Sequence, residues 1–195
     1  EATASHYGFS REAQDAFAIR SLTRAKKAIE AGIFDEEVVS VTIQGRKGDT
    51  LVETDETPLK ANLEKIPTLK PAFAQDGTVT PANSSSISDG AAALVMMRES
   101  TALERGLHPF ARILGHSEHA HEPAWFTTAP VSAIQKLLEK PGWNARDVDL
   151  YEVNEAFAVV TMAAIQDLEL DPEKVNVHGG ACALGHLIGA SGARI

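Results

Sequence analysis

Two polar side chains that could act on a carbonyl group each follow an apolar stretch of the sequence. Asn154 follows the run VDLYEV and is the second residue of VNEAFA. His186 follows the glycine-rich stretch HGGACALG. An Asn at the carboxyl end of a strand can hold a water or a carbonyl oxygen, since α/β proteins bind ligands there. The positive end of a helix dipole keeps a nearby imidazole neutral, and a neutral imidazole can take a proton from a nucleophile. The simpler alternatives are a helix cap for Asn154 and a hydrogen-bonded turn histidine for His186.

The only cysteine of the chain, Cys182, lies four residues before His186. A Cys–His pair can form a nucleophile, which would make a cysteine hydrolase. A free buried Cys more often behaves as a small hydrophobic residue, and we favour that interpretation. One cysteine cannot form an internal disulfide, so a reducing compartment is expected.

Other motifs give no support for a cofactor or a metal. The glycines of residues 176–195 lack the G-x-G-x-x-G spacing of dinucleotide-binding proteins, and no G-K-[ST] follows them. The stretch HSEHAHE (116–122) holds three histidines, but without the spacing of a known metal motif. We therefore expect a solvated loop there, and neither a metal nor a redox cofactor.

Helix and strand patterns alternate along the chain, and they predict an α/β layered sheet. A helix is expected from an N-cap at Ser10 to a stop at Gly32, with a strand in EEVVSVTIQG after it. Residues 45–83 are rich in Gly and Pro and predict a long loop. After a domain boundary near Ser86 we expect strands at 91–97, 110–120, 148–154 and 174–180, and helices at 98–106, 129–140, 155–170 and after His186.

Composition points to a globular protein and away from two classes of partner. The 195 residues are 44% hydrophobic and 23% charged, with a net charge of −9 that argues against nucleic acid. No apolar run approaches the roughly 18 residues of a membrane span, so no membrane is expected. The chain opens without Met or a signal-peptide pattern and stops at Ile195 as a helix begins, which suggests an internal piece of a longer protein.

The two polar stretches together resemble the paired signatures of the thiolase family. VNEAFA followed by NVHGGACALGHLIGASGAR is similar to a family pattern of N-x-N-G-G-A, a few small residues and G-H-P-x-G-A-S-G-x-R. GFSREAQDAFAIRS and AIEAGIFDEEVV resemble the family's long helix and the strand after it. LKPAF and DGTVTPANSSSISDGAAAL resemble its coenzyme A loop, so the resemblance covers essentially the whole chain in order.

The resemblance implies a layered α-β-α-β-α fold, here an incomplete C-terminal half with part of an inserted loop domain. Residues 1–86 correspond to the later part of the coenzyme A-binding loop domain, and residues 87–195 to most of the C-terminal core domain. The implied activity is that of an acyl-CoA C-acyltransferase, which makes or breaks a C–C bond through a Cys-bound acyl intermediate. Such enzymes act on coenzyme A thioesters in fatty acid metabolism without another cofactor, form homodimers or homotetramers, and are expected in the cytoplasm or in an organelle matrix.

The resemblance also assigns site residues one by one. His186 matches the histidine that activates the nucleophilic cysteine and helps to form an oxyanion hole, and Asn154 matches the Asn that positions a water there. Ser85 matches a contact to the pantetheine arm. The remaining substrate-binding positions are Phe73, Phe126, Ala156 and Phe157, with Phe126 where the family often has a Met against the acyl pocket.

The chain also departs from the family. Both catalytic cysteines of the family fall outside it, so we expect residues 1–195 to be inactive alone. Leu187 replaces a Pro, His178 an Asn, and Leu59 an Arg for which Lys60 could compensate. A non-catalytic coenzyme A-binding or structural subunit is the alternative, whereas VNEAFA argues against the sterol-carrier type of thiolase.

Overall fold

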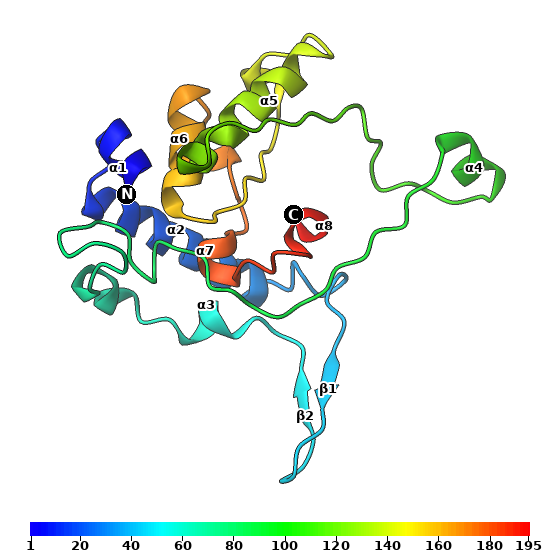
Figure 1. The fold of residues 1–195 in the computed structure, drawn as a ribbon. Helices are drawn as coiled ribbons and strands as arrows, with labels where there is room; N and C mark the ends of the chain where they lie inside the picture. The colour runs from blue at the N-terminus through cyan, green and yellow to red at the C-terminus, as the bar shows by residue number, and fades with distance from the viewer.

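The helix α2 (Arg11–Glu30) is the element on which the rest of the chain is assembled (Figure 1). The computed structural model describes all residues, 1–195. Ser10 caps α2 as expected, since its side chain accepts a hydrogen bond from Ala13 N at 3.2 Å. Gly32, at φ 71°, lies just past the end of the helix, where a left-handed conformation favours glycine. The predicted helix over 10–32 is confirmed.

Most of the other elements are short. The remaining helices are α1 (Ala2–Tyr7), α3 (Glu56–Lys60), α4 (Glu99–Glu104), α5 (Ala129–Glu139), α6 (Ala158–Asp167), α7 (Ala181–Leu184) and α8 (Ser191–Arg194). Four 3-10 turns lie at Leu63–Thr68, Pro123–Thr128, Ala145–Asp147 and Pro172–Lys174. The helices expected at 98–106 and 129–140 are present as α4 and α5, and α8 follows His186.

Three apolar clusters join these elements. The largest lies between α5, α6 and the segments on either side of α6; its buried members are Val131, Tyr151, Val153, Val160, Ala164, Leu170 and Val175. A second cluster packs Leu22 and Ala25 of α2 against Ile66 and Ala183. A third packs Phe17 against Ala158 and Cys182. In Figure 1, α2, α6 and α7 lie together in this packed part of the molecule.

The expected layered sheet does not form within residues 1–195. The only sheet is the antiparallel hairpin β1 (Val41–Ile43) and β2 (Thr50–Val52), which projects from the body (Figure 1). Residues 148–154 and 174–180, expected as strands, meet in one parallel bridge, Tyr151–Val175. A strand needs a hydrogen-bonded neighbour along its edge, and these two segments offer each other only a short one.

The prediction of strands at 91–97 and 110–120 is wrong, because these segments also lack a hydrogen-bonded neighbour. No backbone group in either segment bonds another backbone group, and the apolar side chains of 91–97 are exposed rather than buried, Val95 to 89%. Residues 91–97 lead into the long excursion around α4 that stands away from the packed part (Figure 1). Residues 110–120 return along α5, where Ser117 Oγ donates to Ala133 O at 2.6 Å. We call residues 87–122 the outer arm.

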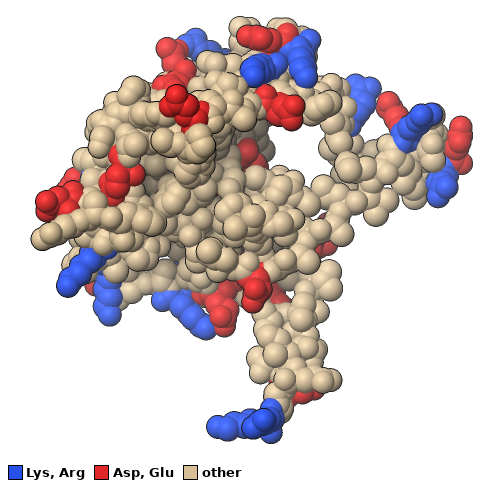
Figure 2. All heavy atoms as spheres, in the orientation of Figure 1, with Lys and Arg blue, Asp and Glu red and all other residues tan.

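Acidic and basic side chains are mixed over the visible face, and basic side chains also mark the free tip of the hairpin (Figure 2). The sequence at that tip is Arg46-Lys47. None of the helices combines the length and the apolar character that crossing a bilayer would require.

Candidate active site

The structure brings Asn154 and His186 together although 31 residues separate them in the sequence. The Nδ2 atom of Asn154 lies 3.4 Å from Nε2 of His186. Both residues are partly buried, as groups at the floor of an open site should be. An oxyanion site requires the side chains of Asn154 and His186 to lie close together, because two side chains on opposite faces of the backbone could not contact the same carbonyl oxygen.

Ser191 fixes the state of the His186 ring. Its hydroxyl donates to Leu187 O at 3.2 Å, and its Oγ lies 2.7 Å from His186 Nδ1. We infer the tautomer from these two contacts: with the hydroxyl proton on the Leu187 carbonyl, Oγ accepts from Nδ1–H, and Nε2 carries the lone pair. Asn154 Nδ2 then donates to that lone pair. In this tautomer Nε2 is the nitrogen that can take up a proton, on the side of Asn154.

This differs from the sequence-based argument for the same protonation state. That argument placed His186 at the start of a helix, whereas α8 begins five residues later and has only four residues. The hydrogen bond from Nδ1 to Ser191, not a helix dipole, orients the ring. Ser191 was missed from the sequence, although its position in GASG so soon after the histidine was a usable signal.

Asn154 does not cap a helix, so the simpler interpretation of this residue is wrong. Helix α6 begins at Ala158 and its N-cap is Phe157. The extended backbone before Asn154 is held by the buried side chain of Asn176, which accepts from Val153 N and donates to Val153 O, each at 2.8 Å. The side chain of Asn154 is therefore free to face His186.

Ser86 and the first residues of the outer arm support the histidine from the other side. His186 N donates to Ser86 O at 2.8 Å, and Ile87 forms a parallel bridge with His186. Gly185 has φ 82°, and a Cβ there would lie 2.3 Å from Oγ of Ser88. Glycine is thus required at position 185, directly before His186.

Leu187, which replaces the family's Pro, does not leave this turn loose. Its carbonyl accepts from Ala190 N at 2.7 Å and from Ser191 N at 2.8 Å. Its side chain is buried and packs on Gly90, where a Cβ would collide with it.

The predicted substrate-binding residues lie next to one another. Ser85 N and Ser85 Oγ both donate to Ala156 O, at 3.1 and 3.0 Å. The ring of Phe157 lies edge-on to Phe73 and Phe126, with centroids 6.1 and 6.3 Å apart. Phe73 and Phe126 are largely exposed. These five residues form a wall that combines a hydroxyl with three aromatic rings, which suits a long, mostly apolar ligand.

Cys182 is not placed to act as a nucleophile. It is buried in the cluster with Phe17 and Ala158, and burial, with the nearby Glu155, raises the pKa of its thiol well above the usual value. The ring nitrogens of His186 bond Asn154 and Ser191 instead. A thiol that stays protonated and apart from any base is unreactive, so the cysteine hydrolase interpretation is wrong.

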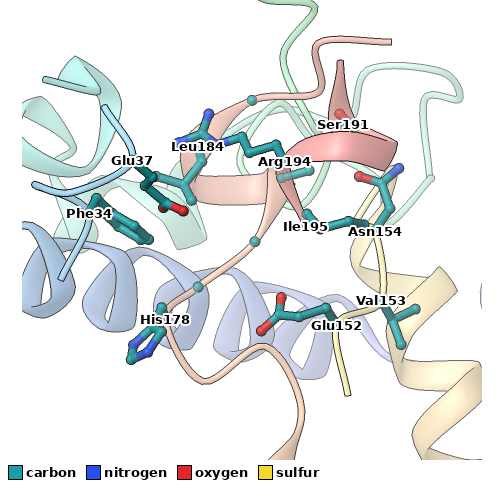
Figure 3. Close-up of a pocket in the computed structure, with 14 residues that line it drawn as sticks. Phe34, Glu37, Glu152, Val153, Asn154, His178, Leu184, Ser191, Arg194 and Ile195 are labelled. Carbon is teal, nitrogen blue, oxygen red and sulfur yellow. The ribbon is translucent and has the colours of Figure 1, made fainter. Parts of the chain in front are cut away.

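A cavity of about 210 Å³ opens beside Asn154 (Figure 3). Ser191 and Asn154 lie at one side of it, and His178, Glu37 and Phe34 lie at the other (Figure 3). Glu152 also lines it, and desolvation together with the charge of Glu155 raises the pKa of the Glu152 carboxyl to about 7. The cavity lining therefore combines two carboxyl groups, Glu37 and Glu152, with the guanidinium of Arg194.

One residue and one stretch singled out in the sequence take no part in this site. Lys60 pairs with Glu56 Oε1 at 2.7 Å and is exposed, so it is not held ready to replace the arginine expected at position 59. In HSEHAHE, the rings of His119 and His121 lie 5.1 Å apart, and His119 Nδ1 is 3.0 Å from Lys136 Nζ.

Comparison with known proteins identifies the family of the chain. The family model described as the N-terminal domain of thiolase matches residues 1–100, and the model of the C-terminal domain of thiolase matches residues 107–195. A cytosolic acetyl-CoA acetyltransferase of Mus musculus is 50% identical over 198 residues, which cover 100% of this chain and 50% of that protein.

Solved structures agree as well. The Bacillus anthracis acetyl-CoA acetyltransferase superposes with a TM-score of 0.95 at 47% identity, covering 98% of this chain and 49% of that one. A thiolase of Ascaris suum, solved in complex with coenzyme A, gives a TM-score of 0.88 at 42% identity and covers 98% and 49%. The chain spans about half the length of the relatives it matches. It belongs to the thiolase family, and its backbone follows about half of that family's α/β fold, although residues 1–195 by themselves pair only two strands.

Proposed function

We propose that the protein carrying this chain is an acyl-CoA C-acyltransferase, and that the chain supplies the base and part of the oxyanion hole. The observation that carries the proposal is the pair formed by Asn154 Nδ2 and His186 Nε2, 3.4 Å apart, with the lone pair on Nε2. A base and a fixed donor at one point are what acyl transfer from a thioester needs.

The geometry suggests the order of proton movements. Nε2 takes the proton of a cysteine thiol, and the thiolate attacks the thioester carbon while the C=O electron pair moves to the oxygen. Nε2–H then becomes a donor beside Asn154 Nδ2, so two donors face the oxyanion. When the tetrahedral intermediate collapses, the C–S bond to coenzyme A breaks, the departing thiolate takes the proton back from Nε2–H, and the acyl group stays on the cysteine.

The nucleophilic cysteine is proposed to come from outside residues 1–195. Cys182 is the only thiol of the chain, and it is buried and protonated at neutral pH. We therefore expect residues 1–195 alone to bind substrate groups without turning them over.

The proposed ligand is a coenzyme A thioester. Support comes from the wall formed by Ser85, Ala156, Phe157, Phe73 and Phe126, and from the Ascaris suum thiolase, which was solved with coenzyme A. A homodimer or homotetramer working in fatty acid metabolism is proposed by analogy with the family. The cytoplasm is the proposed location, because the mouse relative is cytosolic.

The test is thiolysis of a 3-ketoacyl-CoA by the protein that contains this chain, compared with residues 1–195 alone. We expect turnover in the first and none in the second. His186→Ala should lower kcat by about 10²–10⁴-fold, the usual contribution of a positioned base. His116→Ala, an exposed histidine of the outer arm, should leave kcat unchanged. Coenzyme A binding without turnover in the complete protein would instead indicate a non-catalytic subunit.

A further inference from the structure

Glu155 is a charged side chain buried in the packed part of the molecule and unused in the mechanism above. It follows Asn154 directly and is only 1% exposed. Burial raises the pKa of its carboxyl, and hydrogen bonds from Asn176, Ser21 and Cys182 N oppose that rise. The positive charge of Arg20 acts in the same direction as these bonds. A buried carboxylate is retained only where its partners compensate for lost hydration.

All of the carboxylate's partners are donors, and they come from three parts of the chain. Oε1 accepts from Asn176 Nδ2 at 2.8 Å. Oε2 accepts from Ser21 Oγ of α2 at 2.7 Å and from Cys182 N of α7 at 3.0 Å. The Ser21 hydroxyl in turn accepts from Gly180 N at 2.9 Å. This set of donors around two oxygens matches an ionised carboxylate.

One side of this network leads to Asn154. The amide of Asn176 that donates to Glu155 also clamps both backbone groups of Val153, the residue before Asn154. Asn176 holds φ at 49°, an uncommon conformation for a residue with a side chain, which the three bonds of its side chain stabilise. The backbone on both sides of Asn154 is thus fixed by the same carboxylate.

The other side leads to His186. The N–H of Cys182 belongs to the first turn of α7, and Ser21 holds Gly180 just before it. Helix α7 ends at Leu184, and its C-cap is Gly185, the residue before His186. A Cβ on Gly180 would lie 2.4 Å from Cδ of Glu155, so the carboxylate and the glycine turn are fitted to each other.

We propose that Glu155 is a positioning residue that sets the distance between Asn154 and His186 by holding both of their segments on α2. This proposal rests on the proposed function for its kinetic consequence, but its structural part does not. Glutamine cannot replace the carboxylate, because its NH₂ group would face Asn176 Nδ2 or Cys182 N, both of which are donors.

The structural part is tested on the chain itself by NMR, with no activity required. The probe is the nuclear Overhauser effect between the side-chain amide protons of Asn154 and the ring protons of His186. We expect it in the wild type and expect it to be lost in Glu155→Gln. The matched control is Asp15→Asn, which changes another buried carboxylate of the packed part: Asp15 accepts from Arg11 at 2.7 Å and from Asn83 at 3.1 Å.

Asp15→Asn should retain the effect even if it lowers stability. If Glu155→Gln does not fold, Ser21→Ala provides the test instead. It removes one hydrogen-bond donor to Glu155 and keeps the carboxylate charge, so the nuclear Overhauser effect should become weaker. An unchanged Asn154–His186 effect in folded Glu155→Gln or in Ser21→Ala would overturn the proposal, and so would its loss in folded Asp15→Asn.

The kinetic part uses the protein that contains this chain. Glu155→Gln should lower kcat by about 100-fold, the scale of a misplacement of about 1 Å, with a much smaller change in KM. A KM change without a kcat change would overturn the positioning role. If the wild type shows no turnover, the proposed function fails, while the NMR result still decides the role of Glu155.

Discussion

The packed part around α2, α6 and α7 and the outer arm of residues 87–122 use similar amino acids with opposite results. Val175 of the packed part is fully buried, whereas Val95 of the outer arm is 89% exposed. In the packed part even a carboxylate is surrounded by partners, but in the arm the backbone of residues 91–97 has none. The difference shows that burial is set by the neighbours that a segment meets and not by its own composition.

The largest effect is expected where the packed part is tightest. Gly180→Val would push a side chain into Glu155, whose Cδ lies 2.4 Å from the position of a Cβ. We expect it to lower the free energy of unfolding by about 4 kcal/mol or more, because the buried carboxylate would lose its partners. Urea unfolding followed by circular dichroism measures this.

Gly189→Ala is the control for that substitution, since nothing lies within 4 Å of its Cβ position. It should change stability by no more than about 0.5 kcal/mol. Equal losses in the two variants would mean that the glycine turn is not fitted to Glu155.

The same substitution in both regions sharpens the comparison directly. Val175→Ala should cost about 2 kcal/mol, since it empties space in the largest apolar cluster. Val95→Ala should cost less than about 0.5 kcal/mol, because its side chain is already in water. Thermal or urea unfolding of the two variants decides, and a comparable cost for both would show that residues 91–97 are covered in solution.

A smaller effect is expected at Ser191, at the edge of the packed part. Ser191→Ala removes the acceptor at His186 Nδ1 and should cost about 1 kcal/mol of stability. The ¹⁵N shifts of the ring should change from one tautomer to a mixture of both. A ring that stays in the Nδ1–H form would show that another group holds it.

The smallest effect is expected at Glu152, which lies between the two regions. Its pKa is raised from 4.5 to about 7, so the folded state binds the proton more tightly than the unfolded state. Stability from this group is present below about pH 4.5 and is lost as pH rises to about 7. Glu152→Gln should flatten the pH dependence of the melting temperature in that range, by a modest amount because the side chain is partly in solvent. An unchanged profile would place the titration elsewhere.

Local signals predicted the helices well. The Ser10 cap and the Gly32 stop bounded α2 almost to the residue, and the amphipathic pattern before Pro141-Gly142 located α5. Such signals work because caps and breakers act on their own neighbours. The apolar pattern of residues 91–97 failed, since a strand depends on a partner that no local pattern reveals.

The arrangement of the candidate site was predicted in part. Asn154 and His186 were found because they carry the family's signatures, and the structure places them side by side. Glu155 and Ser191 were missed, since an acidic residue or a serine inside a motif does not reveal its partners. The adjoining glycines 179 and 180 were the available signal, as they mark a turn pressed against something bulky.

Asn154 and Glu155 are neighbours in an extended segment, and successive side chains of such a segment point in opposite directions. The side chain of Asn154 contacts His186, whereas the side chain of Glu155 accepts from Cys182 N in the helix that precedes His186. An insertion or deletion of one residue just before this dipeptide would exchange the two directions, turning the acid toward His186 and the amide into the interior. This stretch can therefore tolerate changes of side chain more readily than any change of length.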